Sequence, residues 1–248
     1  YDVSGAGDTV VATLTLALVY NLNVKENKYY KDPALKKWVE AAMLFWVKMQ
    51  NKDGSFDESW PGDRSQPATA FSLCFVGRAF LLMKNELSPK TINKMICAFK
   101  KAAEIIWNKS EVFGAKRGDP EVPNHDAGSV LALELMYHIT KDSNYRKKSK
   151  IYLKELINLQ TKEGYFPEYG GADIGYNTTM LFFLTNYYKL SNNKDILSLI
   201  KKLIKFTSYF IHPDGSLGGT YGSRTTYFCL PSGFEIMSKE IPLAKSIS

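Results

Sequence analysis

The sequence has little cysteine and little histidine, with three of each among 248 residues. Cys74, Cys97 and Cys229 are far apart, form no Cys-x-x-Cys pair and show no metal-ligand spacing with the histidines. This pattern disfavours a disulfide framework and a zinc site made of cysteine and histidine. We expect three reduced thiols that are buried in the core.

Long hydrophobic runs and metal-binding patterns are missing as well. No stretch reaches the roughly 18 consecutive apolar residues of a membrane-spanning helix, so we expect no membrane span. The acidic loops contain no EF-hand pattern, and we expect no metal and no cofactor. No signal peptide is visible, but the chain begins at Tyr1 rather than Met, which leaves the cellular compartment open.

Strand-like alternation is also absent, and helical periodicity takes its place. Apolar residues recur at steps of three and four, which is typical of amphipathic helices. The sequence therefore predicts an all-α fold. The expected helices cover 9–22, 34–49, 67–84, 91–107, 127–139, 146–159, 176–190 and 195–211, with a shorter one at 227–239.

Similar loops follow three of these helices. They read MQNKDGSFDE at 49–58, LQTKEGYFPE at 159–168 and FIHPDGSLGG at 210–219. In each loop an Asp-Gly or Glu-Gly turn precedes an apolar residue two positions after the glycine. Glycine supplies the positive φ that such a turn needs. We expect the apolar residue to pack against the helix ends.

Helix starts rich in small and polar residues recur too. They read GDRSQPATA at 62–70, VPNHDAGSV at 122–130, GGADIGYNT at 170–178 and YGSRTTYF at 221–228, and SGAGDTVVATLTL opens the chain one period earlier. A period of about 50 residues that contains two helices indicates stacked helical hairpins. We expect one domain over residues 1–248, either as a whole protein or as part of a larger one.

The segments FWVKMQNKDGSF and ELINLQTKEGYF share an apolar helix end, a Gln, an acid-Gly turn and a Phe. This form resembles the QW-type repeat of (α/α) toroid proteins, which include terpene cyclases, protein prenyltransferase β-subunits and domains of many polysaccharide lyases and glycoside hydrolases. The resemblance implies antiparallel helical hairpins in a toroid or incomplete toroid, with the inner-helix starts around one funnel. Terpene cyclases need a DxDD or DDxxD motif, and neither occurs.

One helix start carries the pair Asn124-His125, which resembles the Asn-His pair of toroid uronate lyases such as heparinase-like and chondroitinase-like enzymes. The resemblance implies β-elimination, in which donors stabilise the charge that develops at the uronate carboxylate and a tyrosine removes the C5 proton. Tyr176, Tyr221 and Tyr227 are the alternatives for the base. The predicted catalytic residues are Asn124, His125, Asp126, Asp173, Tyr176 and Arg224.

Other groups at these helix starts are candidates for holding the substrate. The net charge of +7 favours an acidic oligo- or polysaccharide as partner. The lysines are scattered over predicted outer helices, so we expect no nucleic-acid partner. Trp60, Phe166 and Tyr169 are expected to stack on sugar rings. The predicted substrate-binding residues are Asp8, Trp60, Arg64, Asn177, Tyr221 and Tyr227.

Two other functions stay open at this point. A glycoside hydrolase needs two carboxyl groups about 5–10 Å apart, although an aspartate at a helix start is more often an N-cap. A non-catalytic carbohydrate- or protein-binding module would use the same basic, aromatic surface. The sequence determines neither the oligomeric state nor whether the chain is an enzyme. The carboxyl groups available to a hydrolase are Asp8, Glu58, Asp126, Glu168 and Asp173.

The opening stretch DVSGAGDTVVATLTLAL also resembles the C-terminal motif of ribokinase-like sugar kinases. The resemblance implies a phosphate held at a helix N-terminus, with Asp8 as the base. Such a kinase needs an α/β sheet upstream, whereas here helical hairpins follow the motif. We therefore interpret the stretch as the first helix start of the repeat, capped by Asp8 or Thr9, with a sugar-kinase remnant as the alternative.

Overall fold

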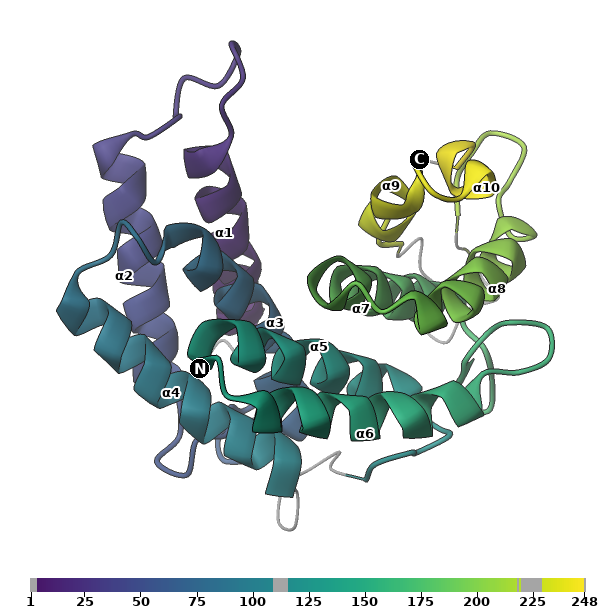
Figure 1. Ribbon diagram of the computed structural model, residues 1–248, viewed down its shortest axis with the longest axis horizontal. Helices are drawn as coiled ribbons and strands as arrows, with labels where there is room; N and C mark the ends of the chain where they lie inside the picture. Colours follow the sequence, from purple (N-terminus) through teal and green to yellow (C-terminus); the bar gives the residue numbers. More distant parts are fainter. Residues whose placement is uncertain (1–3, 109–115, 218, 220–228, 248) are drawn as a thin grey trace. The chain divides into compact units, whose positions relative to one another are not determined.

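The computed structural model describes residues 4–108, 116–217, 219 and 229–247, without the side chains of residues 4–9 (Figure 1). The described chain is all-α, as predicted, and forms two compact units. Unit 1 lies within residues 1–115 and 135–146, and unit 2 within residues 116–134 and 147–248. The single domain over residues 1–248 stays a prediction.

The helices agree with the eight long ones that the periodicity predicts to within four residues at each end, except that α1 begins five residues earlier than predicted. A shorter helix inside 227–239 is confirmed, while the last helix and a small antiparallel hairpin were not expected. The elements are α1 (Ser4–Asn21), α2 (Pro33–Met49), α3 (Gln66–Met83), α4 (Pro89–Asn108), α5 (Pro123–Thr140), α6 (Ser143–Leu159), β1 (Pro167–Glu168), β2 (Gly171–Ala172), α7 (Ile174–Ser191), η1 (Lys194–Ile196), α8 (Leu197–Ser208), α9 (Ser232–Met237) and α10 (Pro242–Lys245).

In unit 1, α1 packs against α2 and α3, and α4 packs against α2 and α3 (Figure 1). The face of α2 that enters the core carries Leu35, Val39, Met43 and Trp46 at helical spacing. The indole ring of Trp46 stacks on Phe56, with 4.7 Å between the ring centroids. The core of unit 1 therefore includes the loop that follows α2.

In unit 2, α7 is the central helix and packs against α8 and α9. A Cβ added at Gly233 of α9 would lie 2.6 Å from Leu181 of α7, so the close approach of these helices depends on a residue without a side chain. The hydroxyl of Tyr188 on α7 donates a 2.7 Å hydrogen bond to Glu240. These contacts join the C-terminal helices to the hairpin repeat.

Buried and amphipathic helices alternate along the chain. Most residues of α3 and α7 are buried, whereas α4 and α8 each bury a single apolar stripe. Inner and outer helices of stacked hairpins show the same alternation. Closure of the hairpins into a toroid stays a prediction.

The two Gln-containing loops have the same hydrogen-bonding structure, which confirms the repeat. In each, the Gln side-chain amide donates one bond to the carbonyl of the turn glycine and one to a carbonyl of the next outer helix, at 2.9 or 3.0 Å. The Gln thereby ties its own turn to the following hairpin. The two sets are Gln50 with Gly54 and Ala98, and Gln160 with Gly164 and Leu199.

The glycines of the repeated turns support a prediction about stability. Gly164 has φ 107°, and a Cβ there would lie 2.6 Å from the carbonyl oxygen of Lys202. Gly215 in the third loop has φ 84°, with no atom within 4 Å of the Cβ position. We predict a loss of about 3 kcal/mol or more for Gly164→Ala and about 1–2 kcal/mol for Gly215→Ala, measured by chemical denaturation. Equal losses would show that the approach to Lys202 does not matter.

The expected cap of the first helix is wrong. Because α1 begins at Ser4, Asp8 and the glycines before it lie inside the helix rather than in a loop at its start. Small residues fill this stretch and continue the helical turns. The loop that a sugar-kinase anion hole requires is therefore not formed by these residues.

The expectation for the cysteines is wrong at one position. Cys74 is buried and Cys229 is half-buried, but Cys97 is exposed because the helical period turns it away from the buried stripe of α4.

The hydropathy of one helix also differs from expectation. Among the described residues, α3 alone is long and apolar enough to cross a membrane, and 61% of it is buried inside the protein, as in a core helix.

Candidate functional site

The structure places the described members of the predicted site in two groups. Asp8, Trp60 and Arg64 belong to unit 1. The largest group lies at the starts of α5 and α7, in unit 2. Tyr221, Arg224 and Tyr227 lie outside the described residues. The group in unit 2 consists of Asn124, His125, Asp126, Asp173, Tyr176 and Asn177.

Asn124, in the first turn of α5, is paired with a carboxyl group from the β-hairpin. Its side-chain amide donates a hydrogen bond to Oε1 of Glu168, the last residue of β1. The backbone amide of Asn124 donates to the same carboxyl group. Asn124 is 2% exposed and Glu168 is 3% exposed. A carboxyl group from 44 residues away thus satisfies donors at the start of α5.

Burial changes the protonation of Glu168. Loss of solvation raises the pKa of Glu168 to about 8; the hydrogen bonds from Asn124 oppose this rise, and the charge of Asp173 adds to it. Oε2 of Glu168 is buried and has no hydrogen-bond partner among the described residues. At neutral pH the Glu168 carboxyl is therefore mostly protonated and uncharged.

Tyr176 lies in the first turn of α7, next to the hairpin. Asp173 is the N-cap of this helix, because its Oδ1 accepts the backbone amide hydrogen of Tyr176 at 2.9 Å. The ring of Tyr176 meets Tyr169 edge-on, with 5.6 Å between the centroids. Tyr169 is 56% exposed and directly follows Glu168. The exposed ring of Tyr169 and the half-buried ring of Tyr176 therefore form an accessible aromatic surface next to the hairpin.

Asp126 in the first turn of α5 stabilises the preceding loop. Its Oδ2 accepts the backbone amide hydrogen of Gly118 at 2.6 Å, and it is 1% exposed. Burial, together with the charge of Asp126, raises the pKa of Tyr152. The guanidinium of Arg117 lies 5.0 Å from the Tyr152 ring centroid. Asp126 therefore stabilises the loop before α5, and its catalytic role stays a prediction. His125 beside it is half-buried.

Two expected substrate contacts are corrected by burial. Phe166 and Asn177 are each 1% exposed. The backbone amide of Phe166 donates to Oδ1 of Asn177 at 3.0 Å, and Nδ2 of Asn177 donates to the carbonyl of Asp173 at 2.7 Å. Asn177 therefore fixes the loop onto α7, and Phe166 packs in the core instead of stacking on a sugar.

Two of the unit 1 candidates, Trp60 and Arg64, lie in the loop before α3. Trp60 is 62% exposed, as a residue that stacks on a sugar must be. Nε of Arg64 donates a 2.6 Å hydrogen bond to Asp53 in the preceding turn. The side chain of Asp8 belongs to the part of α1 whose side chains are not described.

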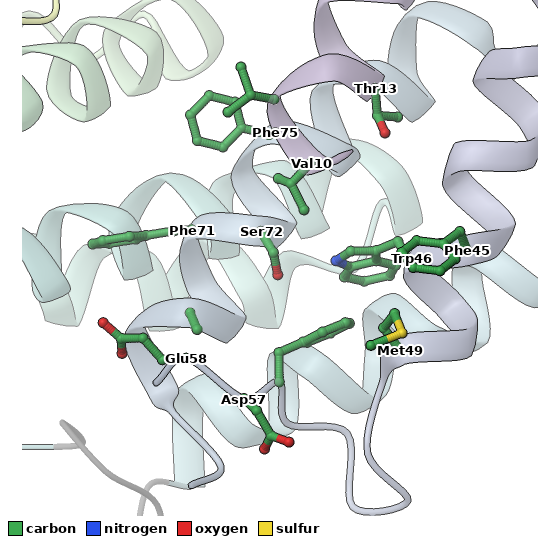
Figure 2. Close-up of a pocket in the computed structure, with 13 residues that line it drawn as sticks. Val10, Thr13, Phe45, Trp46, Met49, Asp57, Glu58, Phe71, Ser72 and Phe75 are labelled. Carbon is green, nitrogen blue, oxygen red and sulfur yellow. The ribbon is translucent and has the colours of Figure 1, made fainter. Parts of the chain in front are cut away.

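Unit 1 also holds a pocket of about 260 Å³ between α1, α2, α3 and the loop after α2 (Figure 2). Its walls are mainly aromatic and aliphatic, with Phe45, Trp46 and Phe75 among them, while Asp57 and Glu58 lie at one edge. Among the residues whose side chains are described, the pocket is lined by the hydrolase candidate Glu58 but by none of the residues predicted for β-elimination or substrate binding. An apolar wall with carboxylates at its edge is poorly suited to an acidic sugar.

The candidate site is therefore the α5–α7 cluster, which we define as Asn124, Glu168, Tyr169, Asp173 and Tyr176. Its groups are an amide donor, a neutral carboxyl group, a capping carboxylate and two phenols, which suit hydrogen bonding and proton transfer. In the part of the chain that the structure describes, no three His, Cys, Asp and Glu side chains are placed to hold one metal ion.

The sequence did not identify the partnership of Glu168 with Asn124. A signal was present, because the two Gln-containing loops both place a glutamate two residues after the buried Phe. Glu58 in the first loop accepts a 2.5 Å hydrogen bond from Ser65 at the next helix start, whereas Glu168 binds the start of the preceding inner helix. The loop motif thus predicts a glutamate at a helix start but not at which one.

Repeated helical hairpins define the class as an all-α hairpin-repeat protein. The family described as the ulvan lyase N-terminal domain matches residues 17–230, and the chain belongs to this family. The match includes the whole α5–α7 cluster, and most of the kinase-like stretch precedes it. Comparison with curated proteins gives no match.

Proposed function

We propose that this protein binds a uronate-containing acidic polysaccharide and cleaves it by β-elimination at the α5–α7 cluster. The observation that carries the proposal is the hydrogen bond that Asn124, in the first turn of α5, donates to Glu168 of β1. Glu168 directly precedes Tyr169, whose ring contacts the ring of Tyr176. The family description names ulvan as the polysaccharide of its lyases. The net charge of +7 favours a polyanionic substrate.

The proposed chemistry begins with the carboxylate of the uronate. The Asn124 amide and the His125 imidazole donate hydrogen bonds to it and stabilise the negative charge that develops when the C5 proton leaves. The phenolate of Tyr176 takes this proton. The C5–H electron pair forms the C4–C5 double bond, the C4–O bond breaks, and the leaving oxygen receives a proton from the tyrosine. Arg224 stays a candidate donor, and Tyr221 and Tyr227 stay alternative bases.

Substrate binding would extend beyond the reacting uronate. Tyr169 is exposed beside the cluster and offers a ring face to a neighbouring sugar. Asp8, Trp60, Arg64, Tyr221 and Tyr227 stay predicted substrate-binding residues.

Glycoside hydrolysis is the second candidate, and one observation favours it. A hydrolase needs a protonated carboxyl group near an ionised one, and Glu168 has its pKa raised to about 8, mainly by burial, with Asp173 close enough to add to the rise. The matched family, however, is described as a lyase. We therefore rank hydrolysis below elimination.

Asn124→Ala tests the role of the amide. With a uronate polymer such as ulvan as substrate, the variant should form unsaturated uronate, followed by its ultraviolet absorbance, about 10²–10³-fold more slowly. Asn144→Ala is the matched control, since Asn144 is an exposed asparagine in the first turn of α6. Circular dichroism verifies that both variants are folded. Equal rates for Asn124→Ala and wild type would remove the amide from the mechanism.

A further inference from the structure

We propose that Glu168 is a proton-carrying positioning residue, which in its neutral form orients Asn124 and keeps a negative charge away from the anionic substrate. This inference rests on the proposed function, because it assigns a role within that site. It adds a residue outside the predicted catalytic set and a pH dependence of substrate binding.

The position of Glu168 is fixed from two sides. β1 and β2 pair antiparallel with Glu168 opposite Gly171, and the turn between them places Tyr169 at φ 51° and Gly170 at φ 80°. The backbone amide of Tyr169 donates a 2.9 Å hydrogen bond to the carbonyl of Glu121, in the chain just before α5. The hairpin is thus anchored to the segment that leads into Asn124.

The contact of Glu168 with Asn124 sets the direction of the amide. The side-chain nitrogen of Asn124 carries two hydrogens, and one of them is donated to Oε1 of Glu168. The other is then held in a fixed direction and serves as the donor to the substrate carboxylate. Without Glu168 the side chain of Asn124 would lose this partner and rotate between staggered conformers.

The charge state of Glu168 matters because the substrate is an anion. The charged group acting on Glu168 is Asp173 from α7, while α5 presents Asn124, with His125 and Asp126 in the same turn, and the loop before it presents the Glu121 carbonyl. An ionised Glu168 would add a second negative charge beside Asp173. Substrate binding should therefore weaken as Glu168 loses its proton.

The test compares the pH dependence of KM for wild type and Glu168→Gln. From about pH 7 to about pH 9 we expect KM of wild type to rise about tenfold, since a new like charge enters the site. In Glu168→Gln the side chain stays neutral and its oxygen still accepts from Asn124, so KM should stay flat. Glu163→Gln is the matched control, because Glu163 is exposed in the same loop and should behave as wild type. The same rise in all three proteins would overturn the proposal.

A second measurement separates this proposal from the proposed function. Carbon NMR of the glutamate carboxyls, assigned by Glu168→Gln, follows the titration of Glu168 without substrate, together with the side-chain amide signal of Asn124. The proposal expects Glu168 to titrate near its raised pKa and the Asn124 signal to move with it. Wild type could show this titration of both signals and still form no unsaturated product. That result would contradict the proposed β-elimination but support the pairing of Glu168 with Asn124. If the Glu168 carboxyl titrates with the pKa of an ordinary glutamate, the proposed positioning role is wrong, whatever activity the protein shows.

Discussion

Tyr176→Phe is expected to lower the rate of β-elimination by about 10²–10⁴-fold, because the phenol proposed to take the C5 proton is removed. The contact of the Tyr176 ring with Tyr169 and the hydrogen bond that the Tyr176 backbone amide donates to Asp173 do not involve the phenol, so both should survive the substitution. The loss should fall on kcat more than on KM. Initial rates of unsaturated uronate formation measure it.

Tyr165→Phe is the matched control for the loss of a phenol. Tyr165 lies in the loop before the hairpin, where its ring packs against Phe206 of α8 with 4.7 Å between the centroids. The control should retain the wild-type rate. If Tyr176→Phe also retains it, the base is Tyr221 or Tyr227, and the same substitution at those positions should then abolish turnover.

The second large effect concerns the dependence of stability on pH. The pKa of Glu168 is raised, by burial, from 4.5 to about 8 in the folded protein. A raised folded-state pKa means that the folded protein binds the proton more tightly than the unfolded chain does. The stability linked to this proton is therefore fully present below about pH 4.5 and declines as pH rises to about 8. The full change amounts to roughly 3–5 kcal/mol.

Glu168→Gln should remove this decline. Because glutamine does not ionise, the free energy of unfolding of wild type minus that of the variant should fall steadily between about pH 4.5 and about pH 8 and be level outside that range. Urea denaturation at a series of pH values gives the difference, in which contributions from other titrating groups cancel. A constant difference would mean that Glu168 is ionised in the folded protein.

The fold was predictable to the extent that it depends on local pattern. Apolar spacing identified the long helices, and the turn glycines with the preceding Gln identified the repeated loop, because both signals involve neighbouring residues. The β1–β2 hairpin was missed because it has only two residues in each strand, too few for alternation to show. The start of α1 differs from the prediction because Gly5 and Gly7, which favour a loop in the sequence pattern, lie inside the helix.

The candidate site was predictable only in its location. Polar helix starts pointed to the first turns of α5 and α7, and the N-cap role of Asp173 follows from its position. The burial of Asn177 and Asp126, and the pairing of Glu168 with Asn124, depend on contacts between segments that are far apart in sequence. Spacing along the chain carries no information on such contacts, so the sequence does not predict them.

The central claim is that this protein breaks a uronate polymer by elimination at the α5–α7 cluster. Digestion of the polymer in water labelled with heavy oxygen, followed by mass spectrometry of the products, tests it most directly. The proposed mechanism predicts fragments with an unsaturated uronate at the new non-reducing end and no label at either new end. Saturated fragments that carry heavy oxygen would contradict it and would identify the protein as a hydrolase.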